Sequence, residues 1–86
     1  MQIVWTVGIS NAANGNFKFF CEVLNSLERF SNHDWGDLCS GDRLANEYAL
    51  IHDERILAKY ETSEGPIYII TEWDRSATTV LFTYEY

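Results

Sequence analysis

The sequence predicts an α+β fold in which two helices pack on one face of a small antiparallel sheet, in the order β-α-α-β-β-β. Two patterns predict it: residues 17–30 carry apolar side chains at helical spacing, and the last third consists of short β-type runs between turns. The chain has 86 residues, of which 47% are apolar, enough for one core. We therefore expect residues 1–86 to form a single compact α+β domain.

The N-terminal region predicts a strand followed by a loop. Residues 3–9 are apolar and β-branched, which favours a strand that joins one edge of the sheet. Residues 10–16 are rich in Asn, Ala and Gly and predict a turn-forming loop. Asn16 is suited to cap the helix that follows, because its side chain accepts a hydrogen bond from a free backbone N–H group.

The main helix is expected over residues 17–30. One apolar stripe follows helical spacing: Phe17, Phe20, Cys21, Leu24 and Leu27. Phe19, Val23 and Phe30 lie at its border and widen the apolar arc to about 200°. Either these border rings pack under neighbouring loops, or Phe19 and Phe30 belong to a partner or dimer surface.

A second, shorter helix is expected to run to about Ile51, with Ser40 or Asp42 as its cap. Leu44, Tyr48 and Ile51 share one of its faces. Three strands follow over residues 55–61, 67–73 and 77–84, separated by short turns that contain Gly, Pro, Asp and Ser. Consecutive strands joined by short turns predict an antiparallel meander.

The sequence contains no pattern that predicts an enzyme. It has no glycine-rich phosphate loop, no nucleophile-elbow motif and no paired histidines on a helix. Cys21 and Cys39 do not have metal-ligand spacing and are expected to be reduced thiols. We expect no cofactor and no metal.

Neither a signal peptide nor a run of about 20 apolar residues is present in this sequence. We therefore expect no membrane association and a cytoplasmic location.

The acidic charge points to a protein partner. Thirteen acids and six bases give a net charge of −7, and phosphate contacts need Lys and Arg, so direct nucleic-acid binding is not expected. An acidic domain is better suited to a basic protein surface. The candidate partner-binding residues are Asp34, Trp35, Asp37, Asp42, Asp53, Glu54, Glu72, Asp74 and Arg75, together with Phe19 and Phe30.

Two of these segments allow structural interpretations as well. In the first, Trp35 would close the edge of the core, Gly36 would permit a tight bend and Asp37 would accept backbone N–H bonds. Its acids, Asp34, Asp37 and Asp42, also allow an oxygen-ligand cation site, although their spacing matches no EF-hand.

In the second segment, a hairpin turn, Arg75 is expected to pair with Glu72 or Asp74. An exposed pair of this kind contributes under about 1 kcal/mol.

The pattern of residues over the last two thirds of the chain resembles a known family. The matching residues are Asp34-Trp35-Gly36-Asp37, Asp42, Asn46, Arg55-Ile56-Leu57, Tyr60, Ile69-Ile70-Thr71-Glu72, Asp74-Arg75-Ser76, Thr78-Thr79 and Glu85-Tyr86. They are similar to short proteins labelled plasmid-related, some with a label of type I restriction subunit M, from plasmids, conjugative elements and phages. Before residue 29 only Thr6 and Gly8 look similar, and Thr83 stands where such proteins often have proline. The resemblance implies a mobile-element setting and no catalytic residues.

Two functions are compatible with these observations. The chain is expected to be a phage or plasmid protein that binds and inhibits a host defence complex, as an anti-CRISPR protein does, and blocks access of nucleic acid. The alternative is a regulatory or accessory interaction module of the mobile element that acts as a homodimer. In both cases the partner is a protein.

Overall fold

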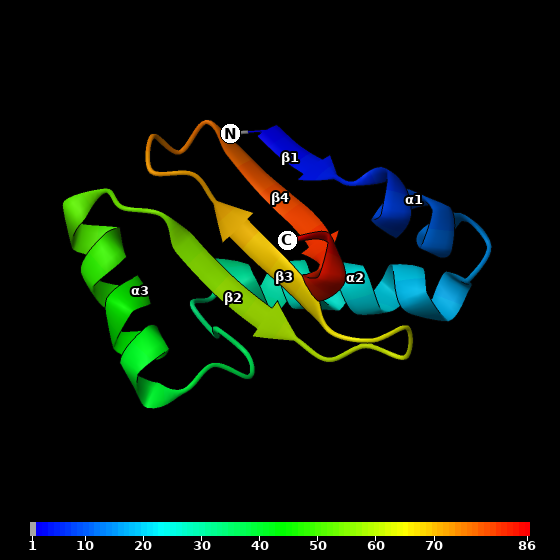
Figure 1. The fold of residues 1–86 in the computed structure, drawn as a ribbon, viewed down its shortest axis with the longest axis horizontal. Coiled ribbons are helices and arrows are strands. Elements are labelled where there is room, and N and C mark those ends of the chain that lie inside the picture. Colours follow the sequence, from blue (N-terminus) through cyan, green and yellow to red (C-terminus); the bar gives the residue numbers. More distant parts are fainter. Residues whose placement is uncertain (1) are drawn as a thin grey trace.

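The computed structural model describes residues 2–86 and has the predicted α+β class. A four-stranded sheet has helix α2 across one face and the C-terminal turn η1 on the other (Figure 1). The elements are β1 (Gln2–Trp5), α1 (Val7–Asn14), α2 (Phe17–Ser31), α3 (Ser40–His52), β2 (Ile56–Tyr60), β3 (Ile67–Thr71), β4 (Ala77–Phe82) and η1 (Thr83–Glu85). The order is thus β-α-α-α-β-β-β, with one helix more than predicted.

The sheet contains the predicted meander and one parallel strand. β2, β3 and β4 pair antiparallel, with Ile56 opposite Thr71. β1 joins the edge of the sheet beside β4, but it runs parallel and places Ile3 opposite Thr78. The prediction of a purely antiparallel sheet was therefore wrong. A parallel pair needs a long crossover connection, and helices α1 to α3 supply it.

Helix α1 occupies residues that the sequence predicted as strand and loop. The strand ends at Trp5, and the Thr6 side chain caps the new helix by accepting a hydrogen bond from the Ile9 N–H group, 3.3 Å away. Ile9 is fully buried in the core. The cap and this buried contact outweigh the β propensity of residues 3–9.

Helix α2 begins at the predicted cap, because the Asn16 side chain accepts from the Phe19 N–H group at 3.1 Å. Its buried side is the predicted border: Phe19 and Val23 are 0% exposed, and the Phe19 ring stacks on Phe82 at 5.6 Å. Much of the predicted stripe faces solvent, with exposed fractions of 78% for Phe17, 36% for Phe20 and 45% for Leu24. The apolar arc of α2 is wide enough for either the stripe or its border to face the core. In the structure the border packs against the sheet.

Helix α3 lies beside the edge strand β2 and not on the face of the sheet (Figure 1). Its Asn46 side chain donates to the Leu57 carbonyl at 2.8 Å and accepts from the Leu57 N–H group at 3.2 Å. Farther along β2, Gly36 forms an isolated parallel bridge with Lys59. The outer edge of β2 is therefore closed by side-chain and backbone hydrogen bonds. This placement corrects the prediction that two helices would cover one face.

Candidate protein-binding surfaces

The bend after α2 is held by Asp34. Its carboxylate oxygens accept from Arg29 Nε at 2.8 Å and Arg29 Nη2 at 3.3 Å, and from the Gly36 N–H group at 3.1 Å. The hydrogen bond from Arg29, followed by that from Gly36, lowers the pKa of Asp34. Asp34, and not Asp37, thus accepts the backbone N–H bond that orders the bend. The Asp37 carboxylate is exposed, while the Asp37 backbone N–H donates to the Lys59 carbonyl at 2.8 Å.

The predicted roles of Trp35 and Gly36 are confirmed. Trp35 is 3% exposed and packs against the edge of the Phe30 ring and the face of the His33 ring. Gly36 has a φ of +73°, and a Cβ atom there would lie 1.9 Å from the Lys59 carbonyl oxygen. These residues belong to the core and its edge, so the structure does not place Trp35 on a partner-binding surface.

The acids of this bend are not gathered into one site. Asp34 is engaged with Arg29, and the Asp42 carboxylate accepts from Cys39 Sγ at 3.3 Å in the first turn of α3. Within residues 2–86, no group of three or more His, Cys, Asp or Glu side chains is arranged to hold a metal ion.

Arg75 joins two acidic segments that are distant in sequence. Its guanidinium donates to backbone carbonyls, Nη1 to Glu54 at 2.7 Å and Glu72 at 3.2 Å, and Nη2 to Ala49 at 2.9 Å. The expected pairing of Arg75 with the Glu72 or Asp74 carboxylate was wrong, because its guanidinium meets backbone carbonyls at and just after the end of α3 and in its own turn.

This contact creates an acidic corner, defined as Asp53, Glu54, Glu72 and Asp74. Three of the four side chains are exposed, and that of Glu72 is half-buried. Hydrogen bonds from the Ser76 side chain and backbone N–H group lower the pKa of Asp74. Two acidic segments that the sequence placed about twenty residues apart therefore form one surface.

The outer side of α3 carries an exposed apolar stripe. The α3 stripe consists of Leu44, Tyr48 and Ile51, which are 70%, 53% and 78% exposed. The buried positions of the helix are Asn46 and Ala49, and the half-buried Leu50 packs against the core beside them. The stripe ends next to the acidic corner, since Ile51 is followed closely by Asp53. Asp53 caps the C-terminal end of α3 in the left-handed conformation, with a φ of 53°.

Sequence reasoning grouped the three stripe residues on one face but did not identify them as a binding surface. The available signal was that the opposite face holds Asn46 and Ala49, which are too small or too polar to reach deep into a core.

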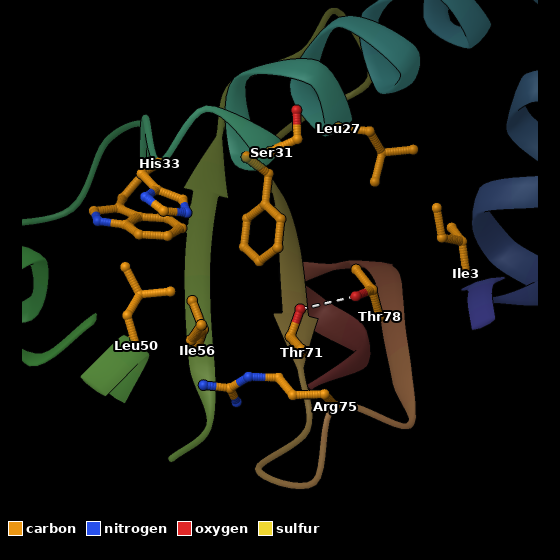
Figure 2. Close-up of a pocket in the computed structure, with 11 residues that line it drawn as sticks. Ile3, Leu27, Ser31, His33, Leu50, Ile56, Thr71, Arg75 and Thr78 are labelled. Carbon is orange, nitrogen blue, oxygen red and sulfur yellow. Dashed lines mark hydrogen bonds between the residues drawn. The ribbon is translucent and has the colours of Figure 1, made fainter. Parts of the chain in front are cut away.

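Phe19 does not belong to the predicted partner surface, whereas the role of Phe30 in such a surface stays a prediction. Phe19 is fully buried, and Phe30 is half-buried and lines a pocket of about 420 Å³ between α2 and one end of the sheet. Figure 2 shows Ile3 and Leu27 at one side of this pocket, and the hydrogen bond between Thr71 Oγ1 and Thr78 Oγ1, 2.8 Å long, at its floor. Its lining is mainly apolar, with Arg75 at the rim.

Comparisons with protein-family models, with curated proteins and with solved structures find no match to this chain. No helix of the described residues is long and apolar enough to cross a membrane. Among the described residues, the α3 stripe and the acidic corner place exposed apolar side chains beside concentrated negative charge.

Proposed function

We propose that this chain is a small non-enzymatic protein of a phage or plasmid that binds and inhibits a host defence protein complex. The binding surface in this proposal is the α3 stripe with the acidic corner. Its partner is a protein with an apolar groove and a basic rim, such as the nucleic-acid-binding face of a CRISPR effector. Occupation of that face would keep nucleic acid away.

The orientation of α3 is the observation that carries the proposal. An amphipathic helix in a small domain normally turns its larger apolar side chains toward the core. Here Leu44 and Ile51 are at least 70% exposed, and of the large apolar residues of the helix only Leu50 packs against the core, beside Asn46 and Ala49. Apolar residues at helical spacing on an outer surface are suited to a groove in another protein. An exposed apolar stripe rimmed by charge is typical of such interaction sites.

The charge distribution supports a basic partner. The chain has a net charge of −7. Its arginine side chains donate hydrogen bonds within the fold: Arg29 to the Asp34 carboxylate, Arg43 to the Leu38 carbonyl, Arg55 to the Tyr86 hydroxyl and Arg75 to carbonyls beside the acidic corner. The carboxylates of the acidic corner form no ion pair within residues 2–86 and can therefore attract a positive surface. Attraction of this kind raises the association rate and weakens as salt is added.

The mobile-element setting comes from the resemblance of residues 29–86 to plasmid-related proteins. Several matching residues have structural roles that explain their identity. Gly36 lies against the Lys59 backbone, and Asn46 closes the edge of β2. The resemblance supports the setting of the proposal, and the α3 stripe supports its mechanism.

Purified CRISPR effector complexes provide the test. Binding of fluorescent target DNA to each complex would be measured by anisotropy, with the chain added at increasing concentration. We expect the chain to displace DNA from one complex, and the double variant Leu44→Ser/Ile51→Ser to require at least about tenfold more protein. Both positions are exposed, so this variant is expected to keep the fold.

The matched control is Val7→Ser/Phe17→Ser, which removes two exposed apolar side chains outside α3 and leaves the net charge and the acidic corner unchanged. This variant should inhibit almost as well as the unmodified chain. Equal inhibition by the α3 double variant would contradict the proposed surface. Failure of the chain to displace DNA from any complex, even at low salt, would contradict inhibition of nucleic-acid access.

The second candidate is a regulatory or accessory module of the element that acts as a homodimer, and the exposed edge of β1, which is suited to self-association, favours it. Such a module would use the same α3 stripe to bind a protein of its own element without displacing nucleic acid. Binding of a replication or transfer protein that is lost in Leu44→Ser/Ile51→Ser, with no effect on DNA binding by effectors, would support this alternative.

A further inference from the structure

The two edges of the sheet differ in how they are closed. Asn46 and the Gly36 bridge cover the outer edge of β2, whereas no segment of residues 2–86 runs along the outer side of β1 (Figure 1). The N–H groups of Gln2 and Thr6 donate to carbonyls of the β4 side, each at 3.1 Å. Because backbone groups alternate along a strand, the N–H and C=O groups of Ile3 and Trp5 point to the open side.

This open edge lacks the usual protection against strand pairing. Natural edge strands are blunted by charged side chains, proline or bulges. Residues 2–17 contain no charged residue and no proline, so the whole net charge of −7 lies in the rest of the chain. Ile3 is 59% exposed and Val4 is 37% exposed. The edge of β1 is therefore apolar, uncharged and able to form backbone hydrogen bonds.

An apolar surface of α2 continues beside this edge. The Trp5 ring lies 5.8 Å from that of Phe20, which stacks on Phe17 at 6.3 Å. Ile3 is on the helix-covered face and lines the same side of the pocket as Leu27 (Figure 2). A residue directly opposite Ile3 on an added strand would project on the same face, toward this pocket.

We propose that β1 pairs antiparallel with β1 of a second copy of this chain, about a twofold axis at Val4. The two open-side residues of each strand then meet, Ile3 of one copy opposite Trp5 of the other, and each pair exchanges both of its N–H···O=C bonds. The two Val4 side chains meet on the opposite face. The two four-stranded sheets become one continuous sheet, and the exposed Ile3 side chain is covered by an indole ring.

The charge identifies the second copy as the occupant. A charged partner, basic or acidic, would find no oppositely charged side chain among residues 2–17. The edge of β1 in another copy is also uncharged and has matching backbone donors and acceptors. Two chains, each with a net charge of −7, would thus meet at a surface where neither carries a charged side chain. Such a twofold contact uses the same surface on both subunits.

This inference goes beyond the proposed inhibitor and uses a different surface. The strand order β1-β4-β3-β2 puts α3 beside the edge farthest from β1. The dimer would therefore present two α3 stripes at its opposite ends. A partner with two sites would be bound with higher avidity by the dimer than by one copy.

Sedimentation equilibrium of the chain at increasing concentration tests the proposal. We expect a mass twice the 10.0 kDa of one chain. Val4→Lys should give a monomer, because it places two ammonium groups side by side at the axis. The control Val7→Lys should remain dimeric, because Val7 is 76% exposed in α1, outside the strand.

Cysteine cross-linking gives an independent readout of the register. In a Cys21→Ser/Cys39→Ser background, which removes both exposed native thiols, Val4→Cys should form a disulfide dimer with oxidised glutathione as the oxidant. Val7→Cys should not. A monomer at all concentrations, or a dimer that Val4→Lys leaves intact and Val4→Cys does not cross-link, would overturn the proposal.

Discussion

Replacement of Gly36 by Ala is expected to destabilise the fold strongly. At a φ of +73°, a residue with a side chain carries a backbone cost of about 1–2 kcal/mol. The new methyl group would also lie 1.9 Å from the Lys59 carbonyl oxygen, which forces the bridge to β2 apart. The bridge contains the bonds Asp37 N–H to Lys59 C=O and Lys59 N–H to Trp35 C=O, each worth about 0.5–1.5 kcal/mol.

The sum is a loss of about 2–5 kcal/mol, a large part of the roughly 4–13 kcal/mol expected for a domain of this length. The melting temperature should then fall by about 10–30 °C. Urea denaturation followed by circular dichroism measures the free energy of unfolding, and a thermal scan measures the melting temperature.

Two other glycines provide matched controls for this measurement. A Cβ atom at Gly15 or Gly41 would meet no atom within 4 Å. Gly15→Ala and Gly41→Ala should therefore be neutral or stabilising by up to about 1 kcal/mol. A loss under about 1 kcal/mol for Gly36→Ala, or an equal loss for Gly41→Ala, would refute the reasoning that contact with the Lys59 backbone dictates glycine at position 36.

Two further predictions concern single side chains. Asn46→Ala leaves both backbone groups of Leu57 without their partner and should lower the free energy of unfolding, measured by urea denaturation, by about 2–4 kcal/mol. As a control, Asn25→Ala at an exposed position should change this free energy by no more than about 0.5 kcal/mol. Because the pKa of Asp34 is lowered below its ordinary 3.8 in the folded state, its pairing with Arg29 stabilises the fold fully above that value and is lost as the pH falls through the folded pKa. Below about pH 4, the free energy of unfolding of Asp34→Asn should therefore fall less steeply with acidification than that of the unmodified chain. The difference should be small, because the pair is exposed. Identical decreases of the two free energies over this pH range would contradict the prediction.

Several parts of the fold could be predicted because their causes are local. Asn16 caps the helix it precedes, and the turns around Gly65 and Asp74 separate three strands that pair as a meander. Trp35 and Gly36 have their expected roles. The helix α1 was missed because the β-branched character of residues 3–9 masked the cap at Thr6.

The candidate site was less predictable from the sequence. The acids at positions 53, 54, 72 and 74 were identified, but the contact that unites them depends on the Ala49 and Glu54 carbonyls, which Arg75 reaches across the fold. Phe19 was assigned to a surface and lies in the core. Leu44 and Ile51 were assigned to one face without any indication that this face is turned outward.

The sequence by itself determined the class of the fold, the main helix and its cap, the meander and the concentration of acidic charge, because these depend on side-chain periodicity, turn residues and composition. Only the tertiary structure decided the parallel pairing of β1, the side of α2 that enters the core, the outward direction of the α3 stripe and the partners of Arg75. The physical reason is that each of these depends on which surfaces fit together across long sequence separations. A helix with a wide apolar arc permits more than one packing, and the shape of the sheet selects among them.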